Sequence, residues 1–321
     1  FTNGDGVLVR VMQGRAKKIE GNPDHPVNRG KATARYDAPL QLLYHPDRLQ
    51  NPQIRYSKSG NAVDISWDQA STRFEQALKN ANGSLTVVTN PLRGHLGSVA
   101  SKFAAQYSGK HMTFDSTEQG VLHGAVKSVF GHDQLPTFDI ANAQTVLSFG
   151  ADWLGTWGSP AQFGVKYGEF REQHDRGYFI HAEPRMSLTA AAADLWLAPR
   201  PGTEGVLALG IARFIITERL ASQPNIAAFN AAVTGGLNDY GIVDVANRTG
   251  IHFDRIEKAA RHFAEHTPSV AFGGGSAGAH TNGSFNLGAI FALNLLVGAV
   301  DSKGGITANP SSALKDIPAS A

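Results

Sequence analysis

The sequence contains no cysteine in its 321 residues. Thiolate ligation of zinc, of an iron–sulfur cluster or of molybdenum by these residues is therefore excluded. A chain without thiols is equally stable in oxidising and reducing surroundings, so this absence gives no information on the cellular compartment.

Charge is also scarce and mixed in sign. Charged residues make up 17% of the chain, and the formal net charge is +2. No stretch concentrates Lys and Arg as a nucleic-acid-binding or lipid-binding patch would require. We therefore expect no nucleic acid among the partners.

No apolar run is long enough to cross a bilayer. The most apolar stretch, residues 287–300, is interrupted by Asn294 and is shorter than the roughly 20 residues that a transmembrane helix needs. We expect a buried helix here and no transmembrane segment of the chain's own. The hydrophobic content of 42% indicates a globular chain with a sizeable core, in more than one domain.

Both ends suggest a longer polypeptide. The sequence opens on Phe1 rather than Met and closes on the loosely patterned residues 310–321. We expect both ends to be cuts in a larger protein.

A β-hairpin is predicted at the N-terminus. Valine occupies every second position from 7 to 11, a turn follows at Gln13-Gly14, and the pattern resumes toward Ile19. Residues 21–48 are rich in turn-forming residues and are expected to be irregular. A small N-terminal β domain is therefore expected to end near Arg55.

The remaining sequence predicts an α/β fold. Ser66 and Gln69 have the spacing of a helix capping box. Short apolar runs then alternate with helical stretches, at residues 85–89, 145–149, 178–180 and 270–272. This alternation is typical of parallel sheets covered on both faces.

Ligands of such sheets bind beyond the carboxyl ends of the strands, where helix N-termini and backbone amides face anions. Gly150 and the glycines at 273–275 follow predicted strands and could serve in this way. They could equally be required by the backbone geometry of the connections, because many such turns need glycine.

Several ordered blocks resemble the molybdopterin-dependent oxidoreductases of the dimethyl sulfoxide reductase type. The blocks are residues 14–30, 44–49, 183–204, 273–280 and 295–305, and they span nearly the whole chain. The resemblance implies an N-terminal β domain at 1–56, an α/β domain begun at 57–137, an inserted α/β domain at 138–267 and a truncated return to the first α/β domain at 268–321.

The chain departs from this family where a cysteine cluster would hold a 4Fe-4S centre. Phe1, Asp5 and Thr33 stand at the corresponding positions. These side chains cannot replace thiolates, so no cluster is expected here.

The family's molybdenum ligand would fall close to Ser116 or Asp115, whose oxygens could bind the metal. The alternative is that both cap or turn the backbone before a helix near Val121, and we expect no metal at this position. The histidines chosen as candidates are scattered, so they are not expected to bind metal either: His25, His45, His111, His123 and His280.

The same resemblance assigns a group of residues to a guanine dinucleotide: Gly150, Glu183, Arg185, Thr203, Glu204, Gly274 and Gly275. Carboxylates would accept hydrogen bonds from guanine or ribose, and amides would face phosphate. Glu183 and Glu204 replace the family's usual Asp, and the extra methylene displaces each carboxylate. Trp153 and Trp157 either belong to the core or fill the cofactor cleft.

We therefore expect a degenerate, cofactor-free scaffold related to the large subunit of alternative complex III, a bacterial quinol-oxidising membrane complex. By that resemblance it would be a peripheral subunit at the periplasmic face of the inner membrane. Its partners would be an iron–sulfur domain, a quinol-binding membrane subunit and cytochrome c, with iron–sulfur clusters and haem elsewhere in the complex.

Two alternatives stay open. The chain could be a catalytic enzyme that binds molybdopterin guanine dinucleotide and uses an oxygen ligand to molybdenum. It could also be a nucleotide-binding module without a redox role.

Overall fold

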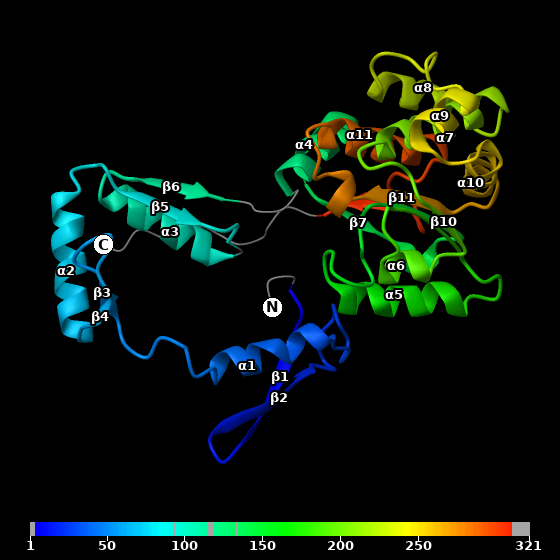
Figure 1. Cartoon of the computed structure of the whole chain (residues 1–321). Helices are drawn as coiled ribbons and strands as arrows, with labels where there is room; N and C mark the ends of the chain where they lie inside the picture. Colours follow the sequence, from blue (N-terminus) through cyan, green and yellow to red (C-terminus); the bar gives the residue numbers. More distant parts are fainter. Residues whose placement is uncertain (1–3, 93, 115–118, 133, 310–321) are drawn as a thin grey trace. The chain divides into compact units, whose positions relative to one another are not determined.

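The computed structural model describes residues 4–92, 94–114, 119–132 and 134–309. They form two compact units (Figure 1). The α/β unit comprises residues 4–36, 119–132 and 134–309, and the small unit comprises residues 37–92 and 94–114. The division into four segments implied by the sequence stays a prediction.

A four-stranded parallel sheet is the centre of the α/β unit. Its strands are β8 (Thr145–Phe149), β9 (Tyr178–Ala182), β10 (Leu195–Leu197) and β11 (Ser269–Gly273). They lie in the order β10-β9-β8-β11, so the chain builds outward from β8 in one direction and then returns to the other side of β8. This is half of a doubly wound sheet, and it confirms the predicted α/β class.

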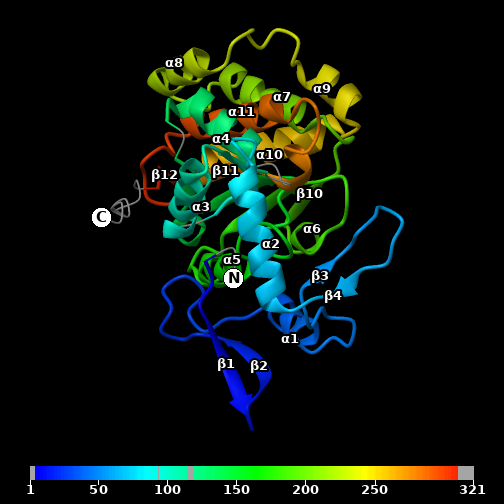
Figure 2. The ribbon, with the colours of Figure 1, turned by 90° about the vertical axis from the view of Figure 1, so that its left-hand side faces the viewer.

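Helices cover both faces of this sheet. Figure 2 shows α5 and α6 on one face and α7, α10 and α11 on the other. The bounds are α4 (Gln119–Phe130), α5 (Pro160–Glu172), α6 (Leu188–Ala191), α7 (Glu204–Thr217), α8 (Gln223–Ala232), α9 (Ile242–Thr249), α10 (Phe253–Glu265) and α11 (Gly283–Leu296). Strands β8 and β11 are buried at every position, as expected for a parallel sheet covered on both sides.

The predicted buried helix is α11, and it begins four residues earlier than the apolar run. No helix of the described residues is both long enough and apolar enough to span a membrane.

The N-terminal hairpin is confirmed. Strands β1 (Val7–Met12) and β2 (Arg15–Gly21) pair antiparallel, with a register shift between Arg10 and Val11. The α/β unit is completed by the antiparallel pair β7 (Pro136–Phe138) and β12 (Ile306–Ala308) and by the short helices η1 (Ala34–Tyr36), η2 (Ile140–Asn142) and η3 (Gly275–Ala277).

The small unit contains a parallel pair of strands, β5 (Thr86–Thr89) and β6 (Lys110–Thr113). The predicted capping box opens α2 (Trp67–Asn80), where Ser66 and Gln69 each accept a hydrogen bond from the other's backbone. The other elements are α1 (Ala38–Leu43), β3 (Gln53–Ile54), β4 (Val63–Asp64) and α3 (His95–Gln106).

Candidate functional site

Strands β8 and β11 flank the point where the strand order reverses, which is where ligands bind in doubly wound sheets. Gly150 follows β8 and Gly274 follows β11. Gly150 has φ 65°, and an added Cβ would lie 2.4 Å from the amide nitrogen of Ala277. The two turns therefore pack directly against each other, and the space between them requires glycine.

The backbone amides of Gly150, Gly274 and Ser276 donate hydrogen bonds within the chain. Gly150 donates to the Ala182 carbonyl at 2.8 Å, and Gly274 donates to the Phe149 carbonyl at 3.1 Å. The Gly150 carbonyl accepts from the amide of Ser276 at 3.2 Å. Neither glycine amide is left to face a phosphate in this arrangement.

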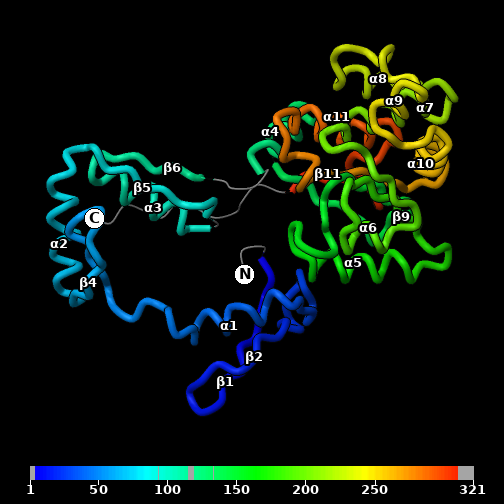
Figure 3. The backbone as a smooth tube through the Cα atoms, in the orientation of Figure 1, coloured from blue at the N-terminus to red at the C-terminus, as the bar shows by residue number. Residues whose placement is uncertain are grey.

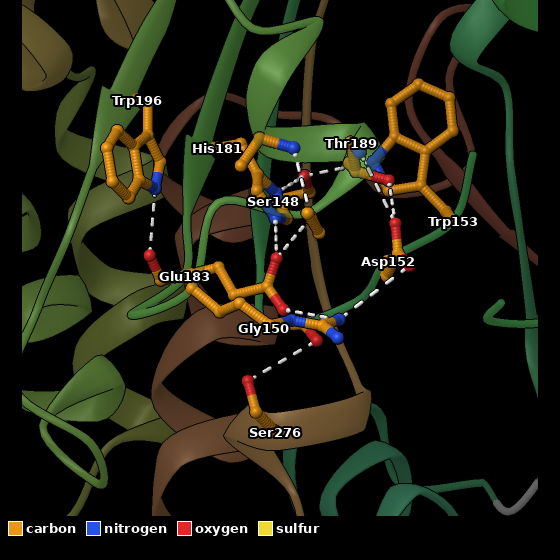
Figure 4. A network of polar contacts seen from close by, with 12 residues as sticks. Ser148, Gly150, Asp152, Trp153, His181, Glu183, Thr189, Trp196 and Ser276 are labelled. Atoms are coloured by element: carbon orange, nitrogen blue, oxygen red, sulfur yellow. Dashed lines mark hydrogen bonds and ion pairs between the residues drawn. The ribbon is translucent and has the colours of Figure 1, made fainter. Parts of the chain in front are cut away.

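Glu183 lies directly after β9, as predicted, but its carboxylate turns back into the protein. The residue is 3% exposed. One oxygen accepts from the Ser187 hydroxyl and lies 3.2 Å from Nε2 of His181, and the other accepts from Arg185 at 3.3 Å (Figure 4). The group that the resemblance assigns to guanine is thus occupied by three side chains of the same chain.

His181 connects this carboxylate to the core. Trp153 Nε1 donates to the Ser148 hydroxyl at 3.1 Å, and the same hydroxyl lies 2.7 Å from Nδ1 of His181. The ring of His181 thus links the Ser148 hydroxyl, at Nδ1, to the Glu183 carboxylate, at Nε2, in one row of polar contacts. Ser148, Trp153 and His181 are fully buried.

Burial alone would raise the pKa of Glu183. The hydrogen bonds from His181 and Ser187 and the charges of His181 and Arg185 outweigh burial, so the pKa lies below its ordinary value. The carboxylate is therefore ionised at neutral pH.

Replacing Glu183 by Gln should lower the free energy of unfolding at neutral pH by about 1.5–3 kcal/mol, because hydrogen bonds to a charged acceptor are lost. A lowered carboxyl pKa stabilises the fold above the unfolded-state value of about 4.3, and this stabilisation is lost as pH falls through the folded-state pKa. Wild type should therefore lose more stability than Glu183→Gln between about pH 5 and pH 3, as measured by urea unfolding.

Exposed Glu172 supplies the matched control. Glu172→Gln should keep the acid dependence of wild type. An equally steep acid loss in Glu183→Gln would show that the network does not hold the Glu183 pKa down.

Arg185 bridges two carboxylates. Besides Glu183, its guanidinium lies 3.8 Å from Oδ2 of Asp152. Asp152 in turn accepts from the Thr189 hydroxyl at 2.7 Å (Figure 4). This ties the loop after β8 to the first turn of α6.

Glu204 opens α7 and is fully buried. Asn286 donates from Nδ2 to its Oε2 at 3.3 Å and also to the Ala277 carbonyl at 3.1 Å. Burial raises the pKa of Glu204, with weaker opposition from nearby amides and His280. Among the described residues, its Oε1 has no hydrogen-bond partner. Thr203 donates to the Arg200 carbonyl at 2.6 Å.

The two tryptophans have different environments. Trp153 belongs to the core, edge-on to Phe179 at 5.1 Å. Trp157 is half-buried, and an added Cβ on Gly274 would lie 2.5 Å from its ring. The indole of Trp157 therefore covers the glycine turn that would approach a phosphate.

Asp5 stands at one of the positions where the family has a cluster-binding cysteine. It is buried and accepts a hydrogen bond from Ser159, the N-cap of α5. Burial and the contact with Asp5 raise the pKa of Tyr36 far above its ordinary value. Within the described ranges, no three His, Asp or Glu side chains are grouped so that they could hold a metal. Phe1, Asp115 and Ser116 lie outside those ranges.

Comparison with known proteins matches residues 48–315 to the molybdopterin oxidoreductase model. The chain belongs to the molybdopterin oxidoreductase family, and the resemblance predicted from its motifs is confirmed.

Two curated relatives match almost the whole chain. The molybdopterin-binding-like subunit of menaquinone reductase from Nitratidesulfovibrio vulgaris is 31% identical over 325 residues, covering 98% of this chain and 45% of that protein. The molybdopterin-containing subunit of arsenate respiratory reductase from Shewanella sp. is 28% identical over 357 residues, covering 97% and 41%. This chain thus spans less than half the length of these relatives.

Among solved structures, acetylene hydratase from Pelobacter acetylenicus superimposes with a TM-score of 0.73 at 21% identity, over 91% of this chain and 41% of that one. This similarity supports the fold alone.

Proposed function

We propose that this chain is a scaffold part of a quinone-linked membrane electron-transfer assembly and binds no pterin. The observation that carries the proposal is the Glu183 carboxylate, which His181, Ser187 and Arg185 already occupy. A dinucleotide could bind there only after these contacts were broken, and the Gly150 amide would also have to leave Ala182. The absence of cysteine supports the further proposal that these residues hold no iron–sulfur cluster.

The link to quinone rests on the similarity to a menaquinone reductase subunit whose name describes it as molybdopterin-binding-like. We retain alternative complex III as the more specific proposal, with a quinol-binding membrane subunit, an iron–sulfur domain and cytochrome c as partners at the periplasmic face. Menaquinone reductase is the second candidate. The two differ in the direction of electron flow, so the purified assembly should either reduce cytochrome c with a quinol or reduce menaquinone.

The intact protein should yield no stoichiometric molybdenum, tungsten, pterin or guanine nucleotide after denaturation. Elemental analysis and fluorescence of the extracted pterin measure this, with a pterin-loaded family member carried through the same procedure as the positive control. Stoichiometric molybdenum that is lost in Ser116→Ala or Asp115→Ala would instead establish the catalytic alternative. Guanine nucleotide without metal would favour a nucleotide-binding module.

A further inference from the structure

The β1–β2 hairpin carries large apolar side chains that are exposed. Leu8 and Val9 are each 50% exposed, Val11 is 59% exposed and Met12 is 58% exposed. Figure 3 shows the two strands side by side up to their turn. A two-stranded ribbon has no second layer of its own to cover such side chains.

The end of the hairpin is apolar on both of its faces. Val11 and Met12 are consecutive in β1, so their side chains point to opposite sides of the ribbon. The turn is tight, with φ of 51° at Gln13 and 74° at Gly14. The result is a narrow tip from which apolar groups project in two directions.

Cations surround this tip. Within residues 7–21 there are four basic side chains and one acidic one, a formal charge of +3, so the rest of the chain sums to −1. Arg10 pairs with Glu20 at 3.1 Å, and Arg15, Lys17 and Lys18 are exposed. The pairing register places Arg15 directly opposite Met12.

We propose that this hairpin docks on an anionic lipid surface, with Val11 and Met12 at the boundary of the acyl chains and the cations on lipid phosphates. A bilayer interface can surround a tip that is apolar on both faces, whereas a flat protein surface covers only one. Basic residues at an anionic membrane each strengthen binding about fivefold. The proposal holds whether or not the chain binds pterin, so it stands or falls separately from the proposed function.

Sedimentation with vesicles of equal parts phosphatidylglycerol and phosphatidylcholine tests the charge requirement. Lys17→Ala with Lys18→Ala should weaken binding about 25-fold. The matched control is Lys102→Ala with Lys110→Ala, which removes two exposed lysines of the small unit and should bind like wild type. Binding of wild type should be negligible on phosphatidylcholine alone and should weaken at high salt.

The absence of cysteine allows a direct test of insertion. Met12→Cys creates a single attachment point for an environment-sensitive fluorophore, whose emission should shift to shorter wavelength with anionic vesicles. The same label at Lys102→Cys should not respond. Thermal unfolding confirms that each variant is folded.

Equal binding by the two lysine pairs, or no fluorescence response at position 12, would overturn the proposal. A different outcome would show that the hairpin docks on a protein instead. In that case wild type does not bind vesicles, and an acidic protein subunit no longer co-purifies with the Lys17→Ala, Lys18→Ala variant.

Discussion

Replacing Trp153 by alanine is expected to lower the free energy of unfolding of the α/β unit by about 3–5 kcal/mol, the usual cost of truncating a buried aromatic side chain. The side chain is fully buried. Its ring meets four others edge-on, at centroid distances of 5.8 Å to Phe163, 5.8 Å to Tyr167, 5.1 Å to Phe179 and 6.0 Å to Phe272. Such pairs add to the burial of apolar area.

Removal of the indole also leaves the Ser148 hydroxyl without its donor, which weakens the row that ends at Glu183. Urea unfolding followed by circular dichroism measures the loss. Trp153→Phe should recover much of it, because an aromatic ring is retained. Trp157→Ala should cost less, since that ring is only half-buried. A loss for Trp153→Ala below about 1 kcal/mol would show that the surrounding rings collapse into the space.

Local patterns made much of the fold predictable. The apolar runs at 145–149, 178–180 and 270–272 became β8, β9 and β11 because each is bounded by turn residues and packs between helices. Strand β10 was not predicted. It has only three residues, and it exists because β9 offers it a parallel partner. The order of the strands is likewise a property of long-range packing that periodicity along the chain does not record.

The candidate site was predictable in position but not in detail. The sequence places Glu183 directly after a predicted strand, and this position predicts a carboxylate that binds a ligand. His181 lies two residues earlier on the same face of that strand, and this spacing was the available signal that the carboxylate has an internal partner. Ser187 was not singled out because its contact depends on the turn between β9 and α6.

The basic surface of the hairpin was missed for a related reason. Along the chain, Arg15, Lys17 and Lys18 are three cations followed by the acidic Glu20, and Arg10 is separated from them by the turn. Antiparallel pairing brings Arg10 opposite Lys18 and Met12 opposite Arg15. Pairing therefore brings Arg10 and the apolar Met12 next to cations that already lie close together in the sequence.

Asn294 is the polar interruption of the most apolar stretch, and the structure gives it a role. It is fully buried on α11. Its side-chain oxygen accepts from the amide of Ala271 at 2.9 Å, and its Nδ2 donates to the Ala271 carbonyl at 2.8 Å. Ala271 lies in β11, at the edge of the four-stranded sheet. The side chain thus satisfies backbone groups that an edge strand leaves unpaired.

Asn294→Leu is accordingly expected to destabilise the α/β unit by about 2–6 kcal/mol, even though leucine is similar in size and suits the apolar helix. Each buried backbone group left without a partner costs about 1–3 kcal/mol, and the substitution leaves two on Ala271. Asn225→Leu is the matched control, because it removes a single hydrogen bond, to the Leu296 carbonyl, at a partly buried position. It should cost about 0.5–1.5 kcal/mol in the same urea titration. If both variants lose equally little, water or a further strand must reach the outer edge of β11, and α11 does not seal the sheet there.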